Sequence, residues 1–384
     1  MFSGRSDLPE LPIVGREMLF LDHPLAGRVS RRANLDMCTK VRTSGTQGIP
    51  VIMYMSKSEA LFRKLSLVRA WKQVDRLRFP LNVIDLGARL DPTGGLTCRW
   101  HGPVKLTRVP ITNLDTKAAA KLQRFRQAIL TGYPTSLTWF VESIGTEVSK
   151  LSIRMIATRG EILHGDTREA LGRAFGCPVY DFYNCEEIGN IAWQCPNDKN
   201  KMHVNTDTCI VEVVDDSGSR LPKGEEGRIL ITNLYNCTMP LIRYDIQDRG
   251  RFLSDEGNRC SCGSRHPTIG RVEGRSDDFL MLGDGSRISP RLLAARFGLE
   301  VEKSRVRGYQ GPLHRGYQID QDAPDHLTVR VVAVEDIGIS FESRVVEAFR
   351  QIAPSLRCSI VAVESLPLSS TGKLQKVVCS FKHL

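Results

Sequence analysis

Long apolar runs are absent from this 384-residue sequence. No run approaches the roughly 18 residues that a membrane-spanning helix needs. The N-terminal stretch MFSGRSDLPELPIVGREM also lacks the apolar core of a signal peptide. Internal repeats and low-complexity tracts are missing as well, which excludes repeat arrays and low-complexity chains. Together these absences predict a cytoplasmic protein without a membrane partner.

Disulfides are not expected either. The chain has eleven cysteines, an odd number, and cytosolic proteins keep their thiols reduced. We therefore expect free thiols or metal ligands. With 41% hydrophobic and 25% charged residues, the composition is typical of a globular protein. A length of 384 residues suits one large domain and one smaller domain.

Positive charge is concentrated in one part of the chain, which we call the basic segment. The net charge is +10, and residues 57–126 contain fifteen Lys or Arg against five Asp or Glu. Apolar residues at helical spacing predict an amphipathic helix over 58–78 with a cationic face; they are Leu61, Leu65, Val68 and Trp71. Such a face indicates an anionic partner, either a nucleotide-like cofactor or nucleic acid, or else a merely solvated surface.

The first two thirds of the chain have the pattern of an α/β protein. Short apolar runs that end at glycine lie at 81–87 and 154–160, and they predict buried strands of a sheet. Between them, a helix is expected over 118–130. A β-hairpin is expected over 209–231, with DDSGS as its turn.

The character of the chain changes near residues 274–279. Beyond this point LTVRVVAV and CSIVAVESL are strand-like, and ESRVVEAFRQI between them has a helical pattern. The predicted fold class is therefore mixed. Residues 1–275 form a large domain of α/β layers with a β-rich portion, and residues 276–384 form a small α+β domain.

The octamer TSGTQGIP at residues 43–50 contains very little side chain. Gly45 and Gly48 permit positive φ and close backbone approach, while Thr43, Ser44 and Thr46 supply short hydroxyl groups. Successive backbone N–H groups in such a turn form a concave anion site that suits phosphate. A solvated turn between two elements would have the same composition.

Four further segments follow the octamer in a fixed order: YNCEEIG (183–189), PLIRYDIQDRG (240–250), GRSDDFLMLGDG (274–285) and LPLSSTGKLQK (366–376). Together with the octamer they resemble the acyl- and aryl-adenylating enzymes, and within them the phenylacetate-coenzyme A ligase group. The resemblance implies a large adenylate-forming domain and a small mobile C-terminal lid domain. It also implies ATP-dependent adenylation of a carboxylic acid, followed by thioester formation with coenzyme A (CoA).

The resemblance assigns the octamer to the β- and γ-phosphates of ATP, through Thr43, Ser44, Gly45, Thr46 and Gly48. In YNCEEIG it implies that Tyr183 stacks near the adenine and that Glu187 holds Mg²⁺. A carboxylate at this position is chemically sensible, because Mg²⁺ is usually bound by one or two carboxylates together with phosphate oxygens and waters.

The remaining segments of the resemblance supply ribose, hinge and cation positions. Asp248 matches the carboxylate that accepts both ribose hydroxyls, with Asp245 as the alternative acid nearby. Arg275 matches a second ribose or phosphate contact, and Asp277 matches the hinge of the small domain. Lys373 matches the mobile lysine that bridges the attacking carboxylate and the α-phosphate, where charge builds up as pyrophosphate leaves.

Three positions depart from the family pattern. Gln47 and Ile49 stand where the family usually has Thr and Lys, so phosphate charge must be met by backbone N–H groups, Mg²⁺ and other basic residues. Glu186 replaces a Thr or Ser that donates to the α-phosphate. A second carboxylate so close to a phosphate would repel it, so Glu186 either turns away or alters the site.

A separate set of residues has the donor types of a zinc site. Cys195 and His203 are separated by seven residues, and Cys260 and Cys262 by one. Three thiolates and one imidazole match tetrahedral Zn²⁺, with His266 as a reserve ligand. Similar positions hold zinc in some relatives of the phenylacetate-ligase group. The alternative is a set of buried thiols without metal.

We therefore expect a ligase that uses ATP, Mg²⁺ and CoA, carries a structural Zn²⁺ and acts on a small carboxylic acid. One alternative passes the acyl group to an amine or a carrier protein. The other is a zinc-containing binding protein with impaired catalysis, which Glu186 and the basic segment favour. Nucleic acid is not expected as a partner, because the basic segment has no interleaved aromatic stripe. A homodimer is left open.

Overall fold

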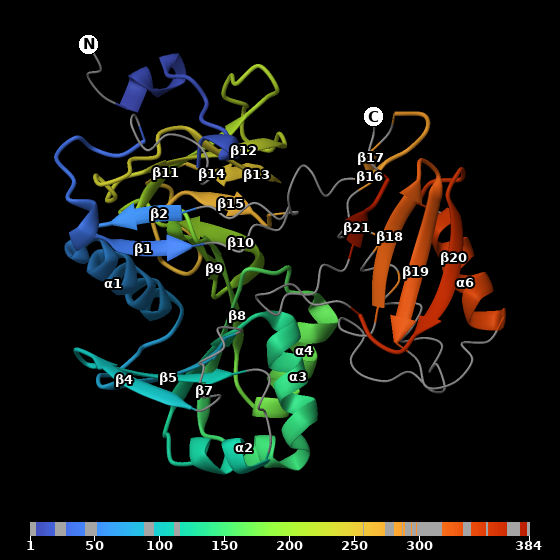
Figure 1. The fold of residues 1–384 in the computed structure, drawn as a ribbon, viewed down its shortest axis with the longest axis horizontal. Coiled ribbons are helices and arrows are strands. Elements are labelled where there is room, and N and C mark those ends of the chain that lie inside the picture. The colour runs from blue at the N-terminus through green and yellow to red at the C-terminus, as the bar shows by residue number, and fades with distance from the viewer. Residues whose placement is uncertain are drawn as a thin grey trace. The chain divides into compact units, whose positions relative to one another are not determined.

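The computed structural model describes residues 5–19, 28–42, 52–87, 96–110, 116–255, 257–272, 280–285, 287–288, 293, 297, 317–332, 339–350, 352–366 and 377–381 (Figure 1). The chain divides into two compact units. Unit 1 comprises residues 1–78 and 180–276, and unit 2 comprises residues 79–179 and 277–384. The predicted domain boundary at 275/276 lies outside the described residues and stays a prediction. Within the described residues, no helix combines the length and the apolar character of a membrane span.

Unit 1 is mostly antiparallel β-structure with one long helix. Its elements are the short 3₁₀ helices η1 (Arg5–Glu10), η2 (Arg16–Leu19) and η3 (Leu35–Met37), the helix α1 (Lys57–Val74), and the strands β1 (Thr39–Arg42), β2 (Ile52–Met55), β8 (Val179–Cys185), β9 (Gly189–Cys195), β10 (Asp198–Val204), β11 (Cys209–Val214), β12 (Gly227–Asn233), β13 (Tyr244–Gly250), β14 (Phe252–Ser254) and β15 (Thr268–Gly270).

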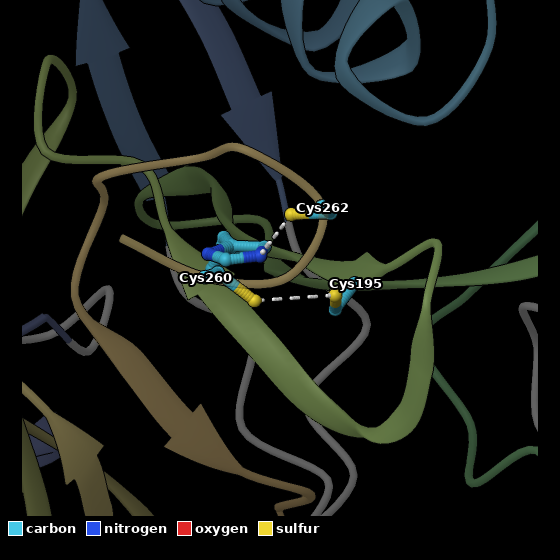
Figure 2. Close-up of side chains that lie close together, drawn as sticks. Cys195, Cys260 and Cys262 are labelled. Atoms are coloured by element: carbon cyan, nitrogen blue, oxygen red, sulfur yellow. Dashed lines mark hydrogen bonds between the residues drawn. The ribbon is translucent and has the colours of Figure 1, made fainter. Parts of the chain in front are cut away.

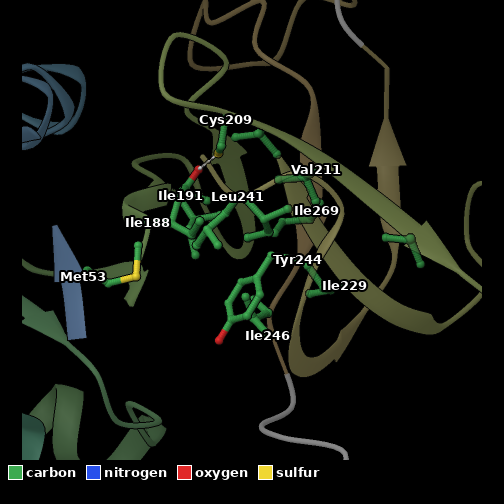
Figure 3. Packing of buried hydrophobic residues seen from close by; sticks show 14 of the residues in the cluster. Met53, Ile188, Ile191, Cys209, Val211, Ile229, Leu241, Tyr244, Ile246 and Ile269 are labelled. Atoms are coloured by element: carbon green, nitrogen blue, oxygen red, sulfur yellow. Dashed lines mark hydrogen bonds between the residues drawn. The ribbon is translucent and has the colours of Figure 1, made fainter. Parts of the chain in front are cut away.

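Three groups of strands build unit 1. β1 and β2 form a hairpin-like pair, and β14, β15, β10, β9 and β8 lie side by side in that order. β11, β12 and β13 form a separate three-stranded antiparallel sheet. The strands share one apolar core, in which Ile188 and Ile191 pack with Ile229, Leu241 and Tyr244 (Figure 3). This core fixes the two larger sheets of unit 1 against each other.

The first part of unit 2 is a parallel α/β sheet. Its elements are β3 (Leu81–Gly87), β4 (Thr97–His101), β5 (Val104–Pro110), α2 (Thr116–Leu122), β6 (Ala128–Gly132), α3 (Pro134–Ile144), the 3₁₀ helix η5 (Gly145–Lys150), β7 (Ile153–Arg159) and α4 (Gly165–Phe175). The strand order is β7, β6, β3, β5, β4, and only β4 runs antiparallel to its neighbour.

The C-terminal part of unit 2 is a small α+β structure with its own core. Its elements are β16 (Leu280–Met281), β17 (Arg287–Ile288), β18 (Tyr317–Ala323), β19 (His326–Val332), α6 (Ile339–Arg350), β20 (Arg357–Val363) and β21 (Val377–Cys379). The strands β20, β19, β18 and β21 form one sheet, against which Phe341, Val345 and Phe349 of α6 pack. The predicted mixed fold class is confirmed.

Most predicted elements are confirmed, but three are wrong in part, among them the helix over 58–78. The helix expected over 118–130 ends at Leu122, and Ala128–Leu130 begin the fully buried strand β6. Residues 123–127 form the turn between the two elements, and Gln127, with φ of 50°, directly precedes β6. In the hairpin, DDSGS does form a turn, but the second strand starts only at Gly227.

The helix over 58–78 is confirmed as α1 but ends at Val74, and only Trp71 of its expected apolar face is fully buried. Leu61 and Leu65 are exposed, whereas the buried face consists of Ser66, Ala70, Trp71 and Val74. This face packs against β9. Small side chains at 66 and 70 let the helix approach the sheet closely, so local apolar spacing identified only part of the buried face.

A buried ion pair ties the start of the chain to the three-stranded sheet. Arg243, from PLIRYDIQDRG, lies 3.3 Å from the carboxylate of Glu212. Its guanidinium also donates to the carbonyl oxygens of Pro9, Leu11 and Gly218 at 2.8–3.0 Å. Removing one partner of a buried pair usually costs about 3–5 kcal/mol. Arg243 is therefore a structural residue of this segment.

The N-terminus of α1 is held by one carboxylate. Ser56 and Glu59 form a capping box, in which the Ser56 backbone N–H donates to Glu59 at 2.7 Å. The same carboxylate accepts from the backbone N–H groups of Cys237 and Thr238, at 2.8 and 3.1 Å, and from the Thr238 hydroxyl at 2.6 Å. Glu59 thus joins α1 to the loop that follows β12.

We predict that Glu59→Ala lowers the free energy of unfolding by about 2 kcal/mol, because several hydrogen bonds to a charged group are lost. Urea denaturation monitored by tryptophan fluorescence measures the change. Lys64→Ala, at an exposed position on the same helix, is the matched control and should have little effect.

The stability lost in Glu59→Ala should also depend on pH. Burial alone would raise the pKa of Glu59, but the hydrogen bonds from Thr238, Ser56 and Cys237 outweigh burial and lower the pKa. The stabilisation is therefore complete above the unfolded-state pKa and disappears as the pH falls through the folded-state pKa. An equal loss of stability at neutral pH and well into acid would contradict this account.

Candidate functional site

Tyr183 and Asp248 come together from two sheets of unit 1. Tyr183 lies in β8 and Asp248 in β13, and the Tyr183 hydroxyl donates to Oδ2 of Asp248 at 2.6 Å. Burial raises the pKa of Tyr183 well above its ordinary value, and the negative charge of Asp248 raises it further. The phenol is therefore a permanent donor, and the carboxylate is placed to accept hydroxyl groups.

Of the two acids considered in PLIRYDIQDRG, Asp245 has other partners. One oxygen of Asp245 lies 3.0 Å from Nη1 of Arg228, and the other accepts from the Gln247 backbone N–H at 2.7 Å. Gln247 has a φ of 66°, and the pairing of β12 with β13 shifts register at this point. β-Bulges of this kind often re-aim a side chain near a functional site. Asp248 is thus the acid beside Tyr183.

The turn between β8 and β9 carries two glutamates with different surroundings. Glu187 is buried, with 7% of its surface exposed, whereas Glu186 is exposed. Arg63 of α1 lies 3.2 Å from the Glu186 carboxylate and donates to the Glu186 carbonyl oxygen at 2.7 Å. Glu186 is therefore not an uncompensated charge beside the site, which was the concern raised by the sequence.

Cys185 precedes the two glutamates and is a protonated thiol. Burial raises its pKa well above the ordinary value, and the nearby charge of Glu187 acts in the same direction. Cys185 is partly buried, and a thiol with a raised pKa is a poor nucleophile. Cys185 therefore contributes packing to this region rather than reactivity.

Two arginines of α1, Arg63 and Arg69, form ion pairs with residues of unit 1 that are distant in sequence. Arg63 pairs with Glu186, and Arg69 donates to Asn205 Oδ1 at 2.5 Å and pairs with Asp207. Sequence reasoning placed these arginines only on a generally basic helix. Their partners are distant in sequence, so no local pattern could have identified the contacts.

The predicted metal ligands form one cluster. The ligand atoms of Cys195, His203, Cys260 and Cys262 all lie within 4.8 Å of one another. The Sγ atoms of Cys195 and Cys260 point toward each other at 3.7 Å, as Figure 2 shows. Cys262 Sγ lies 3.2 Å from Nε2 of His203. Two sulfurs of a tetrahedral zinc site with bonds near 2.3 Å would lie about 3.8 Å apart, so these residues fit Zn²⁺.

Local structure explains how the cluster is assembled. Cys195 ends β9, and His203 lies in the neighbouring strand β10. Cys260 and Cys262 lie in a tight turn, where the Gly263 N–H donates to the Cys260 carbonyl oxygen at 2.8 Å. Gly263 has a φ of 89°, which glycine adopts without strain.

The protonation states in the cluster also suit a metal. Burial lowers the pKa of His203 and so favours the neutral imidazole that binds metals. Its Nδ1 lies 3.4 Å from the His266 carbonyl oxygen, a partner that can fix the ring. Burial raises the pKa of Cys195 to about 12 in the absence of a cation. A bound Zn²⁺ would reverse this by stabilising the thiolate.

His266 is not among the clustered ligand atoms, although it was the reserve ligand. Its Nδ1 lies 3.1 Å from the Thr206 hydroxyl, and its ring meets the Trp193 ring edge-on at 4.9 Å. The contribution of His266 to the cluster is its carbonyl oxygen, which faces His203.

Several predicted site residues lie outside the described residues. They are Thr43, Ser44, Gly45, Thr46 and Gly48 of the octamer, Arg275, Asp277 and Lys373. Their assigned roles therefore stay predictions.

Comparison with known proteins gives the same class as the sequence motifs. No family model matches the chain. The chain is 27% identical over 295 residues to a phenylacetate-coenzyme A ligase of Thermus thermophilus. The aligned region covers 73% of this chain and 64% of that protein. It is 26% identical over 253 residues to the phenylacetate-coenzyme A ligase of Escherichia coli, covering 63% and 54%.

Solved structures support the fold. A 2-hydroxyisobutyryl-CoA ligase in the postadenylation state, in complex with 2-HIB-AMP, superposes with a TM-score of 0.74 at 17% identity, covering 98% of this chain and 82% of that one. An anthranilate CoA ligase in complex with anthranoyl-AMP superposes with a TM-score of 0.62 at 17% identity, covering 90% and 67%.

The chain has the fold of the adenylate-forming CoA ligases. Its sequence is similar to phenylacetate-CoA ligases, as the ordered motifs predicted. The chain spans between 44% and 64% of the length of the phenylacetate-CoA ligases it matches.

Thiol reactivity tests the protonation and burial described for this region. Cys98 and Cys237 are exposed, whereas Cys209 is fully buried and burial raises its pKa to about 12. With iodoacetamide at pH 8, we predict that Cys98 and Cys237 are alkylated at least roughly tenfold faster than Cys185 and Cys209. Peptide mass spectrometry over a time course measures the rates.

The matched control is the unfolded chain in guanidinium chloride, in which all four thiols should react at similar rates. Alkylation of Cys185 in the folded protein as fast as that of Cys98 would contradict the raised pKa and partial burial of this thiol.

Proposed function

We propose that the protein is an AMP-forming acid–CoA ligase. In the first half-reaction a carboxylate oxygen attacks the α-phosphorus of ATP, the bond to the bridging oxygen of the β-phosphate breaks, and pyrophosphate leaves. In the second, the CoA thiol loses its proton and attacks the acyl carbon, and AMP leaves. The observation that carries the proposal is the Tyr183–Asp248 pair beside the Glu187 turn, in a chain with an adenylate-forming fold.

The described residues would bind the nucleoside end of ATP. Tyr183 would lie against the adenine, and Asp248 would accept from the ribose hydroxyls, which its two oxygens allow. Glu187 would hold Mg²⁺, since the ion favours a carboxylate together with phosphate oxygens. When bound, Mg²⁺ would neutralise charge on the departing pyrophosphate.

The other predicted residues complete the proposed site. Backbone N–H groups of the octamer, with Thr43, Ser44 and Thr46, would surround the β- and γ-phosphates. Arg275 would contact the ribose or a phosphate. Asp277 would act as the hinge of the proposed mobile domain 276–384, which carries Lys373. Lys373 would bring a positive charge to the carboxylate and α-phosphate as they react.

We propose CoA as the acyl acceptor and the cytoplasm as the location. The basic segment carries an excess of positive charge, which suits the 3′-phosphate and pyrophosphate of CoA. Transfer to an amine or a carrier protein is the second candidate. The binding-protein alternative is weakened, because Glu186 is paired with Arg63.

A panel of carboxylic acids tested for ATP–pyrophosphate exchange examines the first half-reaction. We expect one chemical class of acid to support exchange without CoA, and AMP release with turnover to require a thiol. Exchange with every acid at the level of a no-acid control would contradict the proposal. Turnover with hydroxylamine but not with CoA would favour the amine-transfer candidate.

We predict that Lys373→Ala slows formation of acyl-AMP by roughly 10²–10³, the scale of losing one transition-state donor. Conversion of supplied acyl-AMP to the thioester should continue, because the lysine acts on the α-phosphate during adenylation only. Rapid-quench assays of each half-reaction measure the two rates. Lys376→Ala, three residues away, is the matched control, and adenylation by Lys373→Ala at the wild-type rate would show that the role is wrongly assigned.

We predict about one zinc per chain, held by Cys195, His203, Cys260 and Cys262. Elemental analysis of the purified protein measures the content. Replacing Cys260 and Cys262 by Ser should remove the metal and lower the melting temperature, because metal binding contributes to folding free energy. The control replaces the exposed Cys98 and Cys237 by Ser and should keep the zinc. A protein that contains no zinc when purified without chelators would contradict the prediction.

A further inference from the structure

Arg63 of α1 contacts the turn that carries the proposed Mg²⁺ ligand. Its Nη1 donates to the Glu186 carbonyl oxygen at 2.7 Å. Its Nη2 lies 3.2 Å from Oε2 of Glu186 and 3.5 Å from the Cys185 carbonyl oxygen. The guanidinium therefore rests on the residue that directly precedes Glu187.

The turn is shaped to receive this side chain. Gly189 has a φ of 88°, and a Cβ there would lie 3.1 Å from Cγ and 3.2 Å from Nε of Arg63. The same Cβ would lie 3.2 Å from the Tyr235 hydroxyl, which donates to the Ile188 carbonyl oxygen at 2.7 Å. A larger residue at 189 would push Arg63 away from the turn.

Several negative charges surround the Glu187 turn, and a cation there would reduce their repulsion. Glu186, Glu187 and Asp248 are carboxylates, and a nucleotide bound between Asp248 and Glu187 would add further negative charge. Arg63 brings positive charge to this turn. A planar guanidinium is well suited to this task, since its donors match two oxygens of one phosphate.

The Glu186 carboxylate can be replaced by a phosphate as the partner of Arg63. The two side chains are 20% and 53% exposed, and ion pairs with this exposure are weak because water screens both charges. A phosphate that accepts two hydrogen bonds from the guanidinium binds more strongly than one exposed carboxylate oxygen. Since the contact between Arg63 and the Glu186 carbonyl oxygen does not involve the carboxylate, the exchange need not release Arg63 from the turn.

We propose that Arg63 is a phosphate-binding residue of the nucleotide site. Glu186 holds the guanidinium over the turn in the nucleotide-free protein, and the α-phosphate of the nucleotide replaces the Glu186 carboxylate when it binds. The proposal rests on the proposed function, because it assumes that a nucleotide occupies the region of Tyr183, Asp248 and Glu187.

Calorimetric titration of the full chain with AMP and with adenosine tests the proposal, since the two ligands differ only by the α-phosphate. We expect Arg63→Gln to weaken AMP binding roughly ten- to hundredfold, the scale of a lost hydrogen bond to a charged group, and to leave adenosine binding unchanged. Glu186→Gln should strengthen AMP binding, because it removes the competing carboxylate. Lys64→Gln, the same change of charge one residue away, should alter neither affinity.

The outcomes separate this proposal from the proposed function. If the wild type prefers AMP to adenosine and Arg63→Gln keeps that preference, the role of Arg63 is wrong while the nucleotide site stands. Equal losses for AMP and adenosine would show that Arg63 only supports the turn, which also overturns the proposal. If the wild type binds neither ligand, the proposed function fails together with it.

Thermal unfolding of each variant checks that the fold is kept. Should Arg63→Gln not fold, Glu186→Gln alone decides the question, because weaker AMP binding by that variant would contradict the exchange.

Discussion

The candidate site depends on one hydrogen bond between two sheets. The Tyr183 hydroxyl donates to Asp248 across 65 positions of sequence, and it joins β8 to β13. Both strands rest on one apolar core that includes Ile188, Ile191 and Tyr244 (Figure 3). Because that core sets the separation of the sheets, it also sets the position of a protonated phenol beside a carboxylate. This is the combination that we propose binds the nucleoside.

Within the described residues of unit 1, strand β9 connects two features to which we assign a function, the Glu187 turn and the Cys/His cluster. All seven of its residues, Gly189–Cys195, are buried. At its start, Gly189 leaves room for Arg63 and Tyr235 beside the Glu187 turn. At its end, Cys195 enters the cluster with Cys260 (Figure 2). A metal in the cluster would therefore fix one end of the strand whose other end forms the proposed nucleotide site.

Substitutions in the Cys/His cluster and in the Glu187 turn should have different effects. The cluster is built from a turn and two neighbouring strands, and its ligands are mutually close only when all three are folded. The turn is held by partly exposed contacts from α1. We therefore expect substitutions in the cluster to act mainly on stability, and substitutions in the turn to act mainly on ligand binding.

Sequence patterns predicted the parts of this structure that depend on neighbouring residues. The apolar run at 81–87 is strand β3 of a parallel sheet, because strands buried on both faces are apolar throughout. Donor type and spacing also predicted that Cys195, His203, Cys260 and Cys262 belong together, and the structure brings their ligand atoms within 4.8 Å of one another. Ser56 and Glu59 follow the spacing of a capping box, and this signal in the sequence was overlooked.

Contacts between distant residues could not be predicted in the same way. Arg63 and Glu186 are 123 positions apart, and only the packing of α1 on β9 brings them together. The same packing buries Ser66 and Ala70 and leaves Leu61 exposed, against the local apolar pattern. The prediction of a helix up to residue 130 was wrong because Ala128–Leu130 belong to a strand in the buried centre of a sheet.

The path of a carboxylate oxygen tests the central claim most directly. An acid labelled with ¹⁸O in both carboxyl oxygens would be incubated with the protein, ATP and CoA, and the AMP would be analysed by mass spectrometry. Attack of the carboxylate on the α-phosphate predicts AMP that carries a single ¹⁸O and pyrophosphate that carries none. Unlabelled AMP, or ¹⁸O in pyrophosphate or inorganic phosphate, would contradict adenylation as the reaction of this protein.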